Sequence, residues 1–198
     1  MSVSPERLAG WLDRFAAGHG PVTSTVDSGA VTVTAADGTV AELMVPFPPL
    51  RGGDLIVHAL VPRRVGVLLV RLGGYAAGVF DGTKLVTSKV GSRPVHGRSA
   101  AGGQSQQRFA RRREGQVRVA LGVAADTAAN ILLPAVSTLD AVVLGGDRRA
   151  ADDVLEDQRL APLRPLVVEA RLDVPDPRLK VLQSTPDLFR AVRIRITD

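Results

Sequence analysis

The hydrophobic residues near the start of the chain are spaced as in an amphipathic helix. Those that recur at i, i+3, i+4 and i+7 are Leu8, Trp11, Leu12 and Phe15. Ser4 and Pro5 precede them, and this pair is typical of a helix start, because Ser caps free amide groups and Pro suits the first helical position. The pattern predicts a short helix that ends near residues 18–20 and buries its apolar stripe in a core.

A β-hairpin is predicted next, because apolar and polar residues then alternate. Valine and threonine alternate over Val31–Thr34, a turn sequence follows at Ala36–Gly38, and apolar residues resume over Val40–Val45. Three prolines within Pro46–Pro49 then interrupt the pattern. We therefore expect residues 1–60 to form an N-terminal helix and β-hairpin extension.

Strand and helix patterns continue through the rest of the chain. Strand-like runs lie at Leu55–Leu60, Val65–Arg71, Ala76–Phe80 and Leu85–Val90. A long helical pattern over 106–131 follows, and then come a strand at 141–144, a helix over 149–158, a strand at 165–170, a short helix near 177–183 and a strand at 192–196. This order predicts that residues 61–198 form an α/β domain with a mixed β-sheet flanked by helices.

The composition is that of a globular protein without disulfides. Of the 198 residues, 45% are hydrophobic and 23% are charged, which is enough for a core in a chain of one-domain length. There is no cysteine, and His19, His58 and His96 are far apart, so we expect no metal and no cofactor. Apolar runs such as Val65–Val70 are too short to span a bilayer, and no secretory signal is visible. We therefore expect a cytoplasmic protein that does not bind membranes.

Arginine carries most of the positive charge and gathers in one segment. The chain has 25 Lys+Arg against 20 Asp+Glu, a net charge of +5. Between Arg93 and Arg118 the only acidic residue is Glu114, whereas the arginines are Arg93, Arg98, Arg108, Arg111, Arg112, Arg113 and Arg118. The planar guanidinium group suits phosphate, so the cluster predicts contact with a polyanion such as RNA. A solvated helix face is the alternative reading of the same cluster.

The long helical pattern separates basic from apolar residues. At about 100° per residue, Arg108, Arg111 and Arg118 fall on one side of the helix. The apolar residues on another side are Phe109, Val117, Ala120, Leu121 and Ala124. We expect one face to pack against the domain and the other to meet phosphate.

A glycine-rich loop, Gly97–Gly103, leads into this helix, and the run continues as Q-S-Q-Q-R-F-A-R-R-R to Arg113. This run resembles the GGQ segment in the middle domain of eukaryotic and archaeal class-1 peptide-chain release factors, whose pattern is G-G-Q-S-x-x-R-F-A-R-x-R. The matching residues are Gly102, Gly103, Gln104, Ser105, Arg108, Phe109, Ala110, Arg111 and Arg113. The similarity extends over about Val61 to Asp198. The architecture is more similar to the stand-alone release-factor-like proteins of the actinobacterial and chloroflexal VLRF type.

The resemblance implies a peptidyl-tRNA hydrolase that rescues stalled ribosomes. No region large enough to read a stop codon precedes the motif, so we expect the reaction to be independent of a codon. The resemblance places Gly102, Gly103 and Gln104 as catalytic residues at the peptidyl transferase centre of the large ribosomal subunit, with peptidyl-tRNA as substrate. The RNA-binding residues would be Arg98, Ser105, Arg108, Arg111, Arg112, Arg113 and Arg118. We expect a monomer without a small-molecule cofactor.

The chemistry of the motif agrees with this function. Glycine has no Cβ, so paired glycines let a loop approach a reacting ester closely. Ester hydrolysis passes through a tetrahedral species whose oxyanion needs preorganised donors, a role we assign to the backbone N–H of Gln104. The side-chain amide of Gln104 would place or exclude water. Glutamine cannot act as a general base at neutral pH, so we assign proton transfer to the tRNA ribose and the ribosome.

Two other functions fit the same residues. The domain would then be a tRNA endonuclease that cuts near the 3′-CCA end, or a module that binds the ribosome or RNA without catalysis.

Three further groups of residues have ordinary structural interpretations. We expect Gly145-Gly146-Asp147 to be a strand–helix turn capped by Asp147, rather than a nucleotide phosphate site. His96 is expected to be an ordinary loop histidine. A solvated helix face, rather than a cation site, is expected for the acidic residues Asp152, Asp153, Glu156 and Asp157.

Overall fold

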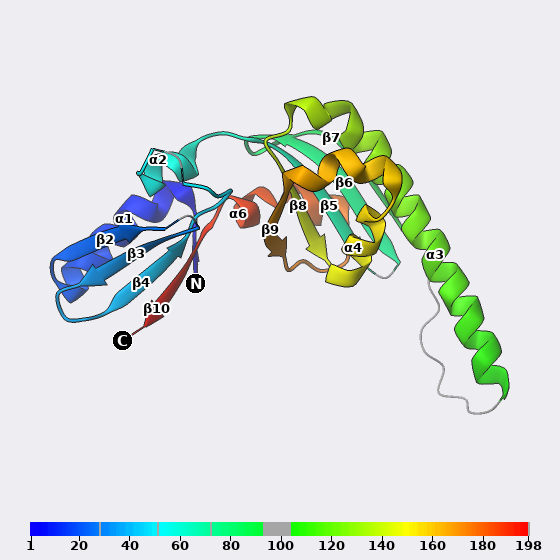
Figure 1. The fold of residues 1–198 in the computed structure, drawn as a ribbon, viewed down its shortest axis with the longest axis horizontal. Helices are drawn as coiled ribbons and strands as arrows, with labels where there is room; N and C mark the ends of the chain where they lie inside the picture. The colour runs from blue at the N-terminus through cyan, green and yellow to red at the C-terminus, as the bar shows by residue number, and fades with distance from the viewer. Residues whose placement is uncertain (28, 51, 72, 93–103, 198) are drawn as a thin grey trace. The chain divides into compact units, whose positions relative to one another are not determined.

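The computed structural model describes residues 1–27, 29–50, 52–71, 73–92 and 104–197, except for the side chains of residues 104–113. The chain divides into two compact units, one of Met1–Pro62 with Pro186–Asp198 and one of Arg63–Thr185. Within the described residues, each unit has a sheet of five strands, in the orders β1-β10-β4-β3-β2 and β7-β6-β5-β8-β9 (Figure 1). The predicted α/β class with a mixed sheet flanked by helices is confirmed.

In the first unit, helix α1 (Pro5–His19) packs on an antiparallel sheet. Pro5 occupies the first turn, and Leu8, Trp11 and Phe15 are buried, which confirms the predicted apolar stripe. The strands paired beside each other are β2 (Val22–Val26), β3 (Ala30–Ala35) and β4 (Val40–Met44). β3 and β4 form the predicted hairpin.

The turn of this hairpin is tied to the end of α1. Gly38 has φ +95°, a conformation that glycine adopts without strain, and Thr39 N donates to Asp37 Oδ1 at 2.9 Å. His19 Nδ1 lies 2.8 Å from Asp37 Oδ2. The hydrogen bonds from Thr39 and His19 hold the pKa of Asp37 below its ordinary value.

The segment Leu55–Leu60 is the helix α2, whereas its apolar run predicted a strand. Asp54 accepts hydrogen bonds from Ile56 N at 2.8 Å and Val57 N at 3.1 Å, so it caps the amide groups of the first turn. Leu55, His58 and Ala59 are buried. A short apolar run fits a buried helix as well as a strand, and here the cap decides the outcome.

The last strand of the chain belongs to the first unit. Strand β10 (Val192–Thr197) pairs antiparallel with β1 (Ser2–Val3) and β4, and helix α6 (Pro186–Phe189) precedes it. Val192 and Ile194 are buried in the core of that unit. From the sequence we expected residues 61–198 to form one domain after an extension of residues 1–60. The pairing of β10 with β4 instead adds residues 186–198 to the first unit.

The second unit is built on a mixed sheet. Strands β5 (Arg64–Arg71), β6 (Gly74–Asp81) and β7 (Lys84–Ser92) form an antiparallel meander. On its other side β5 pairs parallel with β8 (Ala141–Gly146), which pairs parallel with β9 (Val167–Leu172). All residues from Val65 to Val70 are buried, as expected for a central strand covered on both faces.

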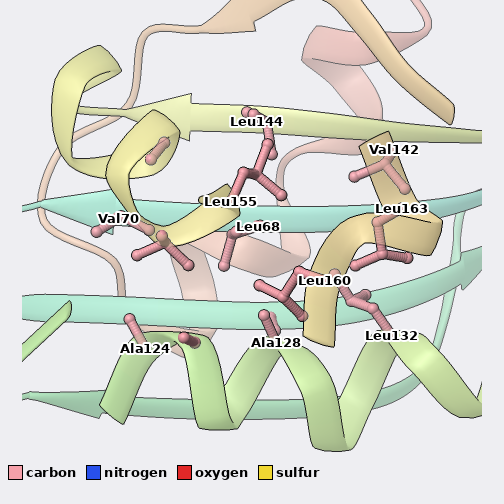
Figure 2. Packing of buried hydrophobic residues seen from close by; sticks show 14 of the residues in the cluster. Leu68, Val70, Ala124, Ala128, Leu132, Val142, Leu144, Leu155, Leu160 and Leu163 are labelled. Carbon is pink, nitrogen blue, oxygen red and sulfur yellow. The ribbon is translucent and has the colours of Figure 1, made fainter. Parts of the chain in front are cut away.

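Helical segments cover both faces of this sheet. One face carries α3 (Gln104–Leu132), the 3₁₀ segment η1 (Leu133–Thr138), α4 (Arg148–Leu155) and the 3₁₀ segment η2 (Gln158–Leu166). On the other face, Leu182 of α5 (Leu179–Gln183) lies over Gly78, where a Cβ would be 3.0 Å from the Leu182 Cδ2. Figure 2 shows Leu144 of the sheet beside Leu155 of α4, and Leu160 of η2 between Leu68 of the sheet and Ala128 of α3, all within one core cluster.

The segment Glu114–Thr138, most of which lies in α3, is long and apolar enough to cross a membrane by length and composition alone, with a mean hydropathy of 1.6. Charged residues interrupt it, so uninterrupted apolar runs in the sequence do not single it out. In the structure, Ala124, Ala128 and Leu132 of this segment are buried against the sheet. Core helices of globular domains meet the same criteria for this reason.

Candidate functional site

The long helix α3 begins at Gln104, directly after the two glycines of the Gly102-Gly103-Gln104 motif. Its other end, Leu132, lies in the hydrophobic core. Figure 1 shows the first half of α3 running past the edge of the sheet on which its second half packs. The motif is therefore joined to the end of a helix whose opposite end is fixed in the domain.

The structure describes the predicted site residues to different extents. Arg98, Gly102 and Gly103 lie outside the described residues. The backbone is helical at the next group, whose side chains are not described: Gln104, Ser105, Arg108, Arg111, Arg112 and Arg113. Arg118 is described completely and is exposed. α3 thus places six of the predicted residues along one helical segment followed by Arg118.

A helix start at Gln104 has a chemical consequence. The first four backbone N–H groups of an α-helix point away from the helix and cannot take part in its own hydrogen-bond ladder. Helix geometry alone therefore makes the Gln104 N–H a candidate donor for another acceptor. The aligned peptide dipoles also give this end partial positive charge, which favours a developing oxyanion or a phosphate.

The faces of α3 agree with the predicted division where side chains are described. Val117, Ala120 and Leu121 are half-buried and Ala124 is buried, whereas Arg118 is exposed. Phe109, Arg108 and Arg111 belong to the part without described side chains. Arg118 is therefore available to a partner, while the apolar side of the helix faces its own domain.

An ion-pair cluster joins the second half of α3 to η2. Arg159 Nη2 lies 2.8 Å from Asp126 Oδ1 of α3 and 2.7 Å from Asp157 Oδ2. The side-chain and backbone hydrogen bonds from Arg159 lower the pKa of Asp157 to about 2. Arg159 and Asp126 are more than half exposed, so solvent screens these pairs and each contributes little to stability.

The Gly145-Gly146-Asp147 segment forms the predicted turn between β8 and α4. Gly146 has φ +87°, and a Cβ there would lie 2.3 Å from the carbonyl oxygen of Val70. Asp147 N donates to that same oxygen at 2.7 Å, and Asp147 Oδ1 accepts from Ala150 N at 2.9 Å. The aspartate thus caps α4, as predicted, with an anion at the position that a bound phosphate would need.

The acidic residues after this turn are not simply a solvated face. Asp152 pairs with Arg171 at 2.7 Å, and Asp157 pairs with Arg159. Among the residues that the structure describes, no three His, Cys, Asp or Glu side chains are grouped so that they could hold a metal ion. His96, the other open candidate, lies outside the described residues.

One feature of the second unit was not predicted from the sequence. A cleft of about 300 Å³ opens between α3 and α4, at the carboxyl ends of β5 and β8. Its lining includes Arg71, Tyr75, Arg149 and Asp153. No local sequence pattern indicates it, because the cleft depends on the parallel pairing of β5 and β8, which brings the residues after both strands to one edge of the sheet.

Fold and motif together define a mixed-sheet α/β domain in which a G-G-Q-S-x-x-R-F-A-R-x-R sequence runs into α3, the longest of the described helices. The family model described as Actinobacteria/chloroflexi VLRF1 release factor matches residues 63–195, which is about two thirds of the chain. The chain belongs to this family of release factors. The family places it among translation-related, ribosome-associated proteins.

Solved structures with a similar fold include the Vms1 mitochondrial localization core, with 8% identity, a TM-score of 0.50 and coverage of 83% of this chain and 76% of that one. The archaeal translation termination factor aRF1 matches with 18% identity and a TM-score of 0.49, over 92% of this chain and 55% of that one. Pelota from Archaeoglobus fulgidus matches with 11% identity and a TM-score of 0.33, over 86% and 51%. The chain thus spans about half the length of the archaeal factor. No curated protein matches the chain.

Proposed function

We propose that the chain hydrolyses the ester of peptidyl-tRNA on stalled ribosomes, without reading a codon. The observation that carries the proposal is the match to the release-factor GGQ pattern, in a sequence that runs into the long helix α3. Membership of a release-factor family supports the same class of reaction.

In this proposal the protein supplies position and donors rather than a base. The Gln104 N–H stabilises the oxyanion, because helix geometry leaves it outside the hydrogen-bond ladder of α3. The two glycines allow close approach to the ester, and the arginines of α3 bind RNA phosphates. The ribosome and the tRNA ribose transfer the proton. The reaction takes place in the cytoplasm at the peptidyl transferase centre, and the protein acts as a monomer.

The test is peptide release from ribosomes that hold labelled peptidyl-tRNA and no stop codon. We expect wild-type protein to release the peptide and Gln104→Ala to lose about 100-fold or more of the rate, because the substitution removes the side-chain amide that places water at the ester while it keeps the backbone N–H. Gln107→Ala is the matched control, since it removes the same side chain at a position that the pattern leaves free. It should keep the wild-type rate.

The tRNA product separates the three candidate functions. An intact 3′-terminal adenosine after Gln104-dependent release establishes ester hydrolysis. A shortened tRNA would replace the proposal with an endonuclease. No release, despite salt-sensitive ribosome binding, would leave a non-catalytic binding module.

A further inference from the structure

The cleft between α3 and α4 has the position of a ligand site, and its described lining residues lie outside the GGQ motif in the sequence. Val70 and Arg71 end β5, and Asp147 follows β8, so the cleft lies outside the carboxyl ends of two parallel strands. The strand after β5 is β6, which lies next to β5 towards one edge of the sheet. The strand after β8 is β9, which lies next to β8 towards the opposite edge. Ligands of α/β proteins commonly bind at such a reversal.

Much of the wall of the cleft is formed by small apolar side chains. Small side chains face it from both helices, Ala120 and Ala124 from α3 and Ala150 from α4. Tyr75 adds an aromatic ring, and Gly91 of the neighbouring strand leaves room for it, since a Cβ at Gly91 would lie 2.3 Å from the Tyr75 hydroxyl oxygen. Such walls suit a flat, unsaturated ring.

The polar groups of the cleft have hydrogen-bonding capacity to spare. Arg149 and Asp153 are exposed and lie four residues apart on α4, yet within the described part of the chain neither side chain has a hydrogen bond or an ion pair. Arg71 Nη1 donates to Val174 O at 3.1 Å, and Asp147 uses Oδ1 for its cap. Donors and carboxylate acceptors thus line the same apolar cleft.

The described lining of the cleft carries both arginine and aspartate side chains, in equal number. Arg71 and Arg149 line it, and the charged residues adjacent in sequence to its lining are the exposed Arg118 and Arg148 and the half-buried Asp152. Asp147 and Asp153 are the acidic residues of the lining. The guanidinium groups suit a phosphate, while the carboxylates suit the exocyclic amine of a base, so the two kinds of side chain together fit a nucleotide.

We propose that this cleft binds one unstacked nucleobase of an RNA strand. The base enters between α3 and α4 against Tyr75, its exocyclic amine donates to Asp153, and Arg149 contacts the adjoining phosphate. Single-stranded RNA is commonly recognised in this way, by stacking and by hydrogen bonds to base edges. The inference deepens the proposed function, on which the identity of RNA as the partner rests, and adds a contact distant in sequence from the GGQ segment.

The test uses the full chain with labelled alanine methyl groups and nucleotides as probes. In NMR titrations, AMP and CMP should shift the signals of Ala120, Ala124 and Ala150 in a saturable way. UMP, which lacks an exocyclic amine, should bind more weakly. Asp153→Ala should weaken AMP about tenfold, the usual effect of losing a hydrogen bond to a charged group.

Two variants, each of which fills the cleft from a different helix, show whether weaker binding comes from the filled cleft or from misfolding of one variant. Ala150→Leu and Ala120→Leu should each weaken AMP at least about tenfold, and the exposed control Val119→Leu should leave the affinity unchanged. The proposal is overturned if AMP causes no shift, or if ribose 5-phosphate binds as well as AMP. It is also overturned if N-acetyl-leucinamide binds in place of nucleotides, which would indicate a protein partner.

The outcome is independent of peptide release. A chain that releases peptide but leaves the cleft signals unchanged with AMP would overturn only the nucleobase site. A chain that binds AMP in the cleft but releases no peptide would overturn only the proposed hydrolase.

Discussion

The two halves of α3 differ in what surrounds them, although they form one continuous helix. In the second half, Ala124, Ala128 and Leu132 are buried among the strands and η2, and Asp126 is paired with Arg159. The first half begins at the GGQ motif and runs past the sheet (Figure 1). Its described residues from Glu114 to Val119 are exposed or half-exposed.

This difference separates stability from chemistry. Burial of apolar surface provides most of the folding free energy, so the second half of α3 should determine whether the domain is stable. The first half can carry arginines and glycines, which would be costly in a core, because it has little core to maintain. Substitutions in the two halves should therefore change different measurements.

The largest expected effect is on peptide release, in the first half. Gly103→Ala should lower the release rate about 100-fold or more, because a Cβ at the tip hinders approach to the ester. Thermal stability and ribosome affinity should stay close to wild type. Gly97→Ala, in the same loop but outside the motif, is the control and should keep the rate. Normal peptide release by the Gly103→Ala protein would contradict the assignment of the chemistry to the GGQ motif and the first half of α3.

The next effect is on stability, in the second half. Leu132 is fully buried, and Leu132→Ala should lower the free energy of unfolding by about 2–5 kcal/mol, the cost of a large core truncation. Val119, half exposed on the same helix, is the control, and Val119→Ala should cost less than about 0.5 kcal/mol. Urea denaturation measures both. An equal loss of unfolding free energy in both variants would show that the two halves of α3 contribute alike to stability.

A smaller effect is expected on ribosome binding at Arg118, near the junction of the halves. Arg118→Gln removes one exposed charge, so the dissociation constant should rise a few-fold and the salt slope of log K should fall by about 1. Arg178→Gln, which also removes an exposed arginine, should leave both unchanged. Filter binding at several salt concentrations would reveal the change. An unaltered slope in Arg118→Gln would remove this residue from the RNA-binding set.

The smallest effect concerns the ion pairs that hold the second half to η2. The pKa of Asp157 is lowered from 3.8 to about 2 by hydrogen bonds from Arg159, so the folded state favours the ionised carboxylate. Its contribution to stability is present above about pH 4 and is lost as the pH falls towards 2. Asp157→Asn should therefore lower the melting temperature slightly at pH 5 and not at pH 2. A difference that persists at pH 2 would argue against ionisation as its source.

Local patterns were enough to predict much of this protein. The stripe from Leu8 to Phe15 indicated α1, alternation indicated the hairpin of β3 and β4, and the Asp147 cap was predicted correctly. These features follow from the sequence because their causes lie within one turn or one strand. The GGQ sequence likewise indicated the release-factor family without any knowledge of the fold.

Only the tertiary structure decided where those elements go. Nothing local to Val192–Thr197 shows that it pairs with β4, because the whole second unit separates the two strands in the sequence. The cleft between α3 and α4 also depends on the parallel pairing of β5 with β8. Sequence determines which segments are strands and helices through short-range periodicity. Partner choice and cavities arise from contacts between residues distant in the chain, which periodicity does not record.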